Sequence, residues 1–81
     1  MLMKREDIKP GVRVLVPNRR THRYGGPAVL VYVENARMDR KVRYKYLLGG
    51  WEYSTFERFI LKEGWLLEES FNDDELKDAF V

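Results

Sequence analysis

The chain contains no cysteine, which excludes disulfide bonds, thiolate zinc sites and cysteine nucleophiles. It has one histidine, His22, so a histidine cluster for a metal ion and a histidine pair for proton transfer are excluded as well. The longest apolar run, residues 28–33, is too short to span a bilayer, and residues 1–6 lack the apolar core of a signal peptide. We therefore expect a soluble, cytoplasmic protein whose 81 residues form one domain.

The charged residues are divided unevenly along the chain. Residues 1–53 carry twelve Lys and Arg against five Asp and Glu, a net charge of +7. Residues 54–81 carry three against eight, a net charge of −5. This asymmetry predicts a basic body over residues 1–64 that binds an anionic partner, followed by an acidic C-terminal segment over residues 65–81. The alternative is a surface of mixed sign that serves solubility alone.

Two segments in the first half have the residue pattern of β-strands. Val12, Val14 and Val16 alternate with other residues at the period of a strand, and Pro17 ends this strand because it has no N–H to donate. Residues 28–33 form a continuous β-branched and aromatic run, which is typical of a central strand covered on both faces. We therefore expect two strands that are separated by a long polar loop.

Residues 41–48 also alternate, with cations on one side and apolar or aromatic side chains on the other. The pair Gly49-Gly50 follows, and two residues that tolerate positive φ predict a tight two-residue hairpin loop. Residues 51–53 then supply the return strand. This hairpin is expected to bury three aromatic side chains: Tyr44, Tyr46 and Trp51.

The next segment, residues 55–63, fits two secondary structures. Ser54 and Glu57 make a capping box, apolar residues follow at helical spacing, and Gly64 would end a helix at its C′ position. The same segment fits a 3₁₀ turn followed by a fifth strand over residues 59–61. Short apolar runs do not distinguish these alternatives by their period.

The last residues have the pattern of a short amphipathic helix. Asn72 is a favourable N-cap, and the acidic residues after it suit the helix dipole. Phe71 and Leu76 occupy the positions of a hydrophobic staple. A helix of about nine residues is unstable alone, so we expect it to dock on another surface.

The order of strands and loops resembles that of the SH3-like small barrel over residues 8–62. In this comparison, residues 18–26 take the place of the long first loop and residues 49–50 that of the distal hairpin. The chain is also similar to small barrel proteins of bacteriophages and other mobile elements. The resemblance implies a binding module for DNA or RNA, for methyl-lysine or for a peptide, and the fold does not choose among these functions.

The loop over residues 18–26 gathers side chains suited to a nucleic-acid backbone. Arginine guanidinium groups bind phosphate oxygens in pairs, and a tyrosine ring can stack on a base. The alternative is a solvated polar loop. The candidate nucleic-acid-binding residues of this loop are Arg19, Arg20, His22, Arg23 and Tyr24.

A second basic cluster follows the strand predicted over residues 41–48. The period of two places its cations on one face at steps of about 7 Å, a spacing comparable with that of backbone phosphates. The alternative is that these side chains only protect an exposed strand from aggregation. The candidate residues of this cluster are Arg37, Arg40, Lys41, Arg43 and Lys45.

The aromatic residues admit another interpretation, a cage for a methylated ammonium group. Six side chains are candidates for it: Tyr24, Tyr32, Tyr44, Tyr46, Trp51 and Tyr53. Four of these fall on faces that are expected to point inward, which favours core packing over a cage. Tyr24 alone is expected to be exposed.

The chain has no recognisable Ser-His-Asp arrangement, paired-carboxylate site or phosphate-loop motif. We therefore expect neither enzymatic activity nor a metal ion or other cofactor.

We predict a mainly β protein, an SH3-like antiparallel barrel of four to five strands with a short C-terminal α-helix. We expect it to bind nucleic acid, DNA or RNA, through the phosphate backbone. The acidic segment is expected to lie near the basic residues and to compete with anionic ligands.

The alternative function is a protein-interaction barrel of phage or mobile-element origin that binds a host protein or a second copy of itself. Its support is a set of apolar residues in the C-terminal segment that would form a docking surface: Trp65, Leu66, Leu67, Phe71, Leu76 and Phe80. If these residues fold back on the body, this alternative loses its main support. No membrane partner is expected.

Overall fold

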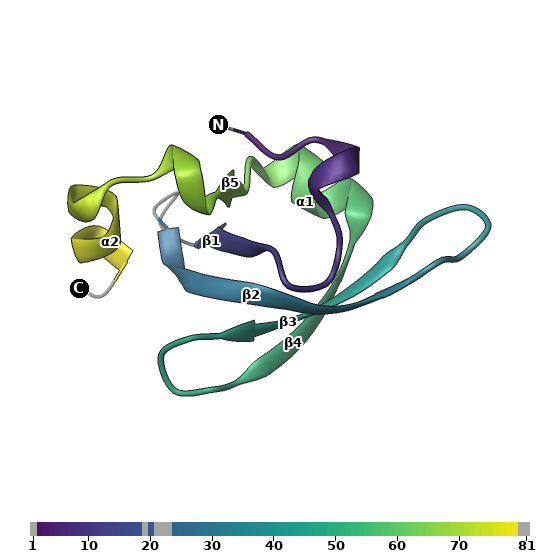
Figure 1. Ribbon diagram of the computed structural model, residues 1–81, viewed down its shortest axis with the longest axis horizontal. Coiled ribbons are helices and arrows are strands. Elements are labelled where there is room, and N and C mark those ends of the chain that lie inside the picture. Colours follow the sequence, from purple (N-terminus) through teal and green to yellow (C-terminus); the bar gives the residue numbers. More distant parts are fainter. Residues whose placement is uncertain (1, 19, 21–23, 80–81) are drawn as a thin grey trace.

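The computed structural model describes residues 2–18, 20 and 24–79. Figure 1 shows the order of its helices and strands along the chain. They are, in order, η1 (Arg5–Asp7), β1 (Arg13–Pro17), β2 (Tyr24–Glu34), β3 (Lys41–Tyr46), β4 (Glu52–Phe56), α1 (Glu57–Glu63), β5 (Leu66–Leu67), η2 (Glu68–Ser70) and α2 (Asp73–Ala79). The expectation of a mainly β protein with short helices is confirmed.

The strands form one five-stranded antiparallel sheet in the order β4-β3-β2-β1-β5. The first four strands follow one another as a meander, and β5 returns to pair with β1 at the other edge (Figure 1). Within the described residues β4 and β5 are the two edges and are not paired with each other, so the sheet is open.

The long strand β2 is the centre of the sheet because it pairs with β1 on one side and β3 on the other. Its register with β3 shifts between Leu30 and Tyr32, which leaves Val31 as a bulge. A bulge bends its strand and increases the local twist. Leu30 therefore pairs with Tyr44 on the inner face, whereas Tyr32 pairs with Arg43 on the outer face.

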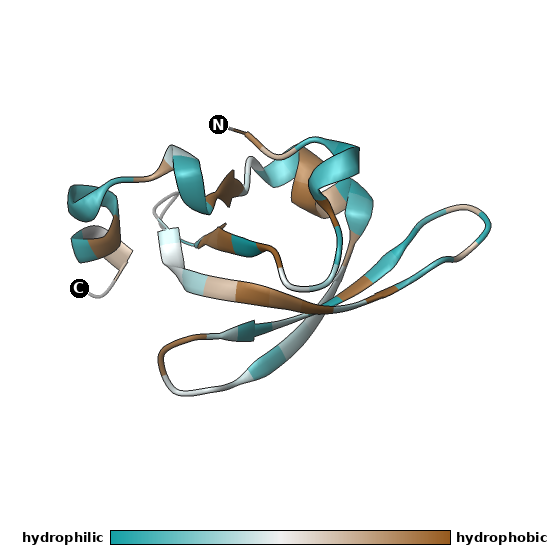
Figure 2. Ribbon diagram, viewed as in Figure 1, coloured by the Kyte–Doolittle hydropathy of each residue, from teal (hydrophilic) through white to brown (hydrophobic). Residues whose placement is uncertain are grey.

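The core lies on the inner face of the sheet. Val14 of β1, Leu30 of β2 and Val42 of β3 are fully buried there. Ile60 of α1 and Trp65 cover them from the other side, so that the apolar segments of β1, β2, α1 and β5 face a common interior (Figure 2). The N-terminal segment adds Met3 and Ile8 to this cluster.

The first two strands are confirmed, but their burial differs from the expected pattern. Leu15 lies on the face of β1 opposite the valines, and it too is completely buried, where it pairs with Pro27 and Leu66. Residues 28–33 do lie in the central strand, as predicted. The expectation that both of its faces are covered is wrong, since Tyr32 is 48% exposed.

The hairpin between β3 and β4 forms, but its loop is longer than predicted. The N–H of Tyr46 donates to the carbonyl of Trp51 at 2.9 Å, so residues 47–50 make a four-residue loop in which Gly49 and Gly50 have φ of 86° and 71°. The predicted burial of Trp51 is wrong, because this side chain is 70% exposed. The hairpin extends beyond the core, and the Trp51 ring lies against Gly49 of its own turn.

The sequence left two structures open for residues 55–63, a helix or a 3₁₀ turn followed by a strand. The structure has a helix, α1, over residues 57–63. Gly64 ends it as predicted, with φ of 77° and an N–H that donates to the carbonyl of Ile60. The capping box of Ser54 and Glu57 is wrong: Ser54 pairs with Arg43 inside β4, and α1 begins only after Phe56. Because Ser54 is paired within the sheet, it does not occupy the N-cap position of α1, which falls on Phe56.

The C-terminal helix α2 is also confirmed. The Oδ1 of Asn72 accepts a hydrogen bond from the N–H of Glu75 at 3.0 Å, which is the expected N-cap. The helix packs against β2. Within the described residues, no helix is long and apolar enough to cross a membrane.

The two tryptophans therefore have opposite environments, and this difference is testable. Replacing Trp51 with Ala is expected to change the free energy of unfolding by less than about 0.5 kcal/mol, because the side chain is exposed. Replacing Trp65 with Ala is expected to cost about 3–5 kcal/mol through the cavity that it leaves. Denaturant unfolding measures both values, and equal losses would contradict this core.

Candidate nucleic-acid interface

The outer face of β3 presents three cations to solvent. Lys41, Arg43 and Lys45 alternate with the inward side chains of the strand, and all three are exposed. Residues that pair across an antiparallel sheet share a face. The cross-strand partners of these cations on β2 and β4 are Glu34 and Phe56, Tyr32 and Ser54, and Val29 and Glu52, respectively.

Two aromatic rings lie among these cations and were missed by the sequence analysis as interface residues. Tyr32 pairs with Arg43, whose guanidinium carbon lies 5.1 Å from the ring centroid. Phe56 pairs with Lys41 and is 38% exposed, and Arg58 lies 5.4 Å from its ring centroid. We call the surface formed by Tyr32, Lys41, Arg43, Lys45 and Phe56 the basic face.

Two acids lie on the same side of the sheet as the basic face and lower its net charge, but they form no ion pair with its lysines in the described residues. Glu34 pairs in register with Lys41, and Glu52 with Lys45. Within the described residues, however, no ion pair joins either lysine to a carboxylate. Both lysine ammonium groups are therefore available to an anionic ligand.

Arg40 was predicted to extend this surface, and the structure gives its guanidinium group partners within the protein. Its guanidinium Nε donates to the carboxylate of Glu57, which is nearly buried, and its terminal nitrogen donates to the carbonyl of Arg5 at 3.0 Å. The Nε of Arg5 lies 3.0 Å from the other Glu57 oxygen. Arg40 is thus a structural residue that joins the end of the β2–β3 loop to η1 and α1.

Arg37 lies in the same loop and is exposed. It lines a shallow cleft of about 210 Å³ together with Arg58 and the Arg40–Glu57 pair. Arg58 is itself paired with Asp39, at 3.3 Å between Nε and Oδ2. Arg37 is therefore the residue of this loop that remains a candidate for phosphate contact.

The long first loop is described only in part. Arg19, His22 and Arg23 lie outside the described residues, so their predicted role is untested. Arg20 is exposed, and its N–H donates to the Oδ1 of Asn18 at 2.9 Å. The described ends of this loop, Pro17 and Tyr24, lie at the start of β2, whereas Arg37 follows the end of β2.

Tyr24 was expected to be an exposed stacking residue, and its side chain is less exposed than expected. It begins β2, pairs with Pro17 and is half-buried. Burial raises the pKa of its phenol, and the nearby Glu75 carboxylate of α2 raises this pKa further. A ring beside a carboxylate is a poor place for a phosphate-bearing strand.

The docking surface of the alternative function is also contradicted at its centre. Trp65 is 1% exposed and Leu66 is buried as well, because β5 pairs with β1. Leu67, Phe71 and Leu76 are half-buried, and Phe80 lies outside the described residues. Trp65 and Leu66 thus fold back on the body, which weakens the support for an adaptor.

Comparisons with protein-family models, with curated proteins and with solved structures find no match to this chain. Within the described part of the chain, no group of three or more His, Asp or Glu side chains is arranged to hold a metal ion. The candidate site is therefore an arrangement of cations and aromatic rings on an exposed face of the sheet.

The different roles of the arginines can be measured. Replacing Arg40 with Ala removes one partner of a nearly buried carboxylate and is expected to lower the free energy of unfolding by about 3 kcal/mol. Replacing Arg5 with Ala is the matched control, expected to cost less than about 1 kcal/mol because its side chain is largely exposed. Similar stability of the two variants would show that Arg40 is not structural.

Proposed function

We propose that the protein is a non-enzymatic nucleic-acid-binding module that contacts single strands through the basic face. The observation that carries this proposal is the alternation of exposed rings and cations on one sheet surface, with Tyr32 beside Arg43 and Phe56 beside Lys41. Exposed cations alone would be explained equally well by the solubility of the protein. Rings and cations together suit a ligand that has both phosphates and flat bases.

The mechanism follows from the geometry of β3. Alternate side chains along a strand are about 7 Å apart, so Lys41, Arg43 and Lys45 can contact successive phosphates. Tyr32 and Phe56 then offer surfaces on which bases stack, and each stacked base contributes about 1–3 kcal/mol. Neither type of contact reads the edges of the bases, so sequence selectivity is low.

The architecture behind this function is proposed to be SH3-like. The five-stranded antiparallel sheet is compatible with a small β-domain of this kind, although its two edges are not joined in the described residues. The similarity to phage and mobile-element proteins stays a prediction. The competition of the acidic segment for the basic residues is also untested, and its described ion pair joins Glu68 to Arg13 at 3.1 Å.

A charge-matched pair of double variants tests the phosphate contacts. Lys41→Ala with Lys45→Ala removes two cations of the basic face, and Lys9→Ala with Lys62→Ala removes two exposed cations elsewhere. For the first variant, the slope of log affinity against log salt for a mixed single-stranded oligonucleotide should fall by about 1.4. The control should retain the slope. Equal slopes in the two variants, or no binding by the native chain at about 50 mM salt, would refute the proposal.

The aromatic contribution is tested separately from charge. Replacing Tyr32 with Ala is expected to weaken single-strand binding by about 1–3 kcal/mol, whereas Tyr32→Phe retains a ring and most of the affinity. Binding of duplex DNA, whose bases are already stacked, should change much less. Fluorescence anisotropy with labelled single-stranded and duplex oligonucleotides measures the difference. A similar loss on both ligands would show that Tyr32 does not stack on bases.

A further inference from the structure

The two edges of the sheet are protected to different degrees. At one edge, β5 is two residues long, and Leu2 forms a bridge to Leu66 on the side away from β1. At the other edge, β4 has five residues, contains neither lysine nor proline, and pairs with β3 in an unbroken register. Lysine, proline, bulges and short length are the usual devices that keep an edge strand from pairing with another chain. The β4 edge has none of them.

The backbone groups on the free side of β4 follow from its hydrogen bonds with β3. The N–H of Tyr46 donates to the carbonyl of Trp51 at 2.9 Å, and the N–H of Glu57 donates to the carbonyl of Arg40 at 2.8 Å. Antiparallel strands alternate between hydrogen-bonded and non-hydrogen-bonded pairs, so every second residue of β4 turns its backbone groups away from β3. The residues whose N–H groups point away from the sheet are Glu52, Ser54 and Phe56.

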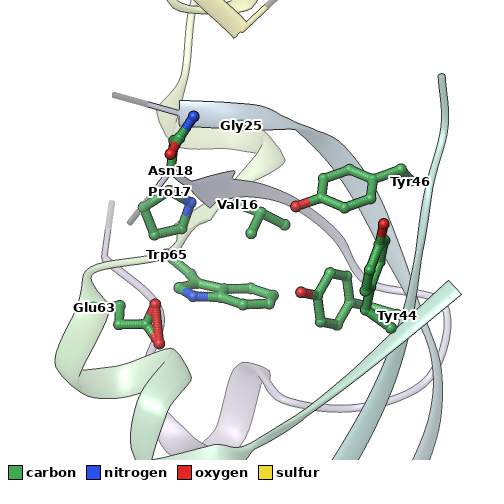
Figure 3. A pocket seen from close by; sticks show the side chains of 9 residues that line it. Val16, Pro17, Asn18, Gly25, Tyr44, Tyr46, Glu63 and Trp65 are labelled. Carbon is green, nitrogen blue, oxygen red and sulfur yellow. The ribbon is translucent and has the colours of Figure 1, made fainter. Parts of the chain in front are cut away.

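The side chains of β4 alternate between the two faces of the sheet. On the inner face, Tyr53 stacks on Tyr44 with the ring centroids 6.0 Å apart, in the aromatic cluster that Figure 3 shows. On the outer face, Glu52 and Phe56 lie at opposite ends of the strand, and the small Ser54 lies between them. The outer side of β4 thus has a small centre and two ends of different chemistry.

This arrangement is complementary to a second copy of itself. A two-fold axis through Ser54 pairs this residue with its counterpart and places Glu52 of each copy opposite Phe56 of the other. This register uses the whole length of β4. An axis through Tyr53 would instead pair Phe56 with Gly50, which lies in the hairpin loop with φ of 71°. An axis through Glu52 would set two carboxylates opposite each other.

The Phe56 end of β4 offers cations to the Glu52 side chain of a second copy. The guanidinium carbon of Arg58 lies 5.4 Å from the Phe56 ring centroid. The Nε of Arg58 meets Asp39, but a guanidinium group has further N–H donors for a second carboxylate. A groove of about 220 Å³ lies at the same end and contains a cation and no carboxylate among its described lining residues. These are Lys41, Ser54, Thr55, Phe56 and Phe59.

We propose that two copies of the chain pair through β4, so that their five-stranded sheets join into one continuous antiparallel sheet. Backbone hydrogen bonds along β4 hold the copies together, and Glu52 of each copy contacts Lys41 and Arg58 of the other. This dimer surface is separate from the apolar residues of the C-terminal segment. It does not depend on the proposed nucleic-acid function, although the two-fold axis would place both basic faces on the same side of the joined sheet.

Sedimentation velocity of the full chain over a series of concentrations tests the proposal. We expect a monomer–dimer equilibrium with a dissociation constant on the order of 10 μM, typical of a small interface. Ser54→Pro should weaken self-association more than about tenfold, because the N–H of Ser54 faces the second copy and is not used within the sheet. Circular dichroism checks that this variant is folded.

Two charge reversals test the register. Glu52→Lys and Arg58→Glu each place like charges at both ends of the paired strands, and each should weaken self-association by about 2–30-fold. In an equimolar mixture of the two variants opposite charges meet again, so dimers of one chain of each kind should form. Glu34→Lys is the matched control. Glu34 is an exposed acid on the same face, but it lies in β2, away from the edge, so this variant should self-associate like the native chain.

A single cysteine reports the position of the axis. The chain has no cysteine of its own. In the proposed register the two copies of residue 54 have their Cα atoms about 5.5 Å apart, which suits a disulfide bond. Under mild oxidation, Ser54→Cys should therefore form a cross-linked dimer much faster than the control Glu34→Cys.

Three results would each overturn the proposal. They are a native chain that stays monomeric at about 1 mM, a folded Ser54→Pro variant that dimerises as tightly as the native chain, and reversed-charge variants that do not recover on mixing. A native chain that dimerises in this way without binding oligonucleotides would refute the proposed function and leave this inference standing.

Discussion

The bulge at Val31 decides which side chains of the central strands reach solvent. In a regular strand, Leu30 and Tyr32 would share a face, and the tyrosine would compete for space in the core. The register shift places Leu30 inside with Tyr44 and Tyr32 outside with Arg43, while Val33 returns to the inner face opposite Val42. One extra residue in β2 thus completes the core and supplies the basic face with an aromatic ring.

The ion pairs of Glu57 explain why the cations near β3 are not equivalent. A nearly buried carboxylate is costly unless it is paired and hydrogen-bonded. Glu57 meets this requirement with Arg40 and Arg5, and its N–H donates to the carbonyl of Arg40 at 2.8 Å. The β2–β3 loop is therefore fastened to the start of α1. Arg40 is occupied by this role, whereas Lys41 and its alternate neighbours stay exposed.

Sequence patterns predicted the helices and strands better than the burial and the contact partners of their side chains. The strands around residues 12–16 and 28–33, the end of α1 at Gly64 and the cap at Asn72 all follow from local chemistry, and all are confirmed. The errors in the burial of Trp51 and Tyr32, and the unforeseen partners of Arg40, share a different cause. Hairpin length, the bulge and the partner of a cation depend on residues distant in sequence, and alternation alone carries none of this information. Neither alternative for residues 55–63 extended the preceding strand through Phe56, since nothing local shows that β4 continues there.

The small size of the domain determines how much of the sheet is exposed. A chain of 81 residues cannot cover both faces of a five-stranded sheet, because its helices are few and short. Part of the β3–β4 hairpin therefore meets solvent on both sides, and alternation along β3 gives these sides different chemistry. The cations Lys41, Arg43 and Lys45 lie on one side, while Tyr44 and Tyr46 lie on the other.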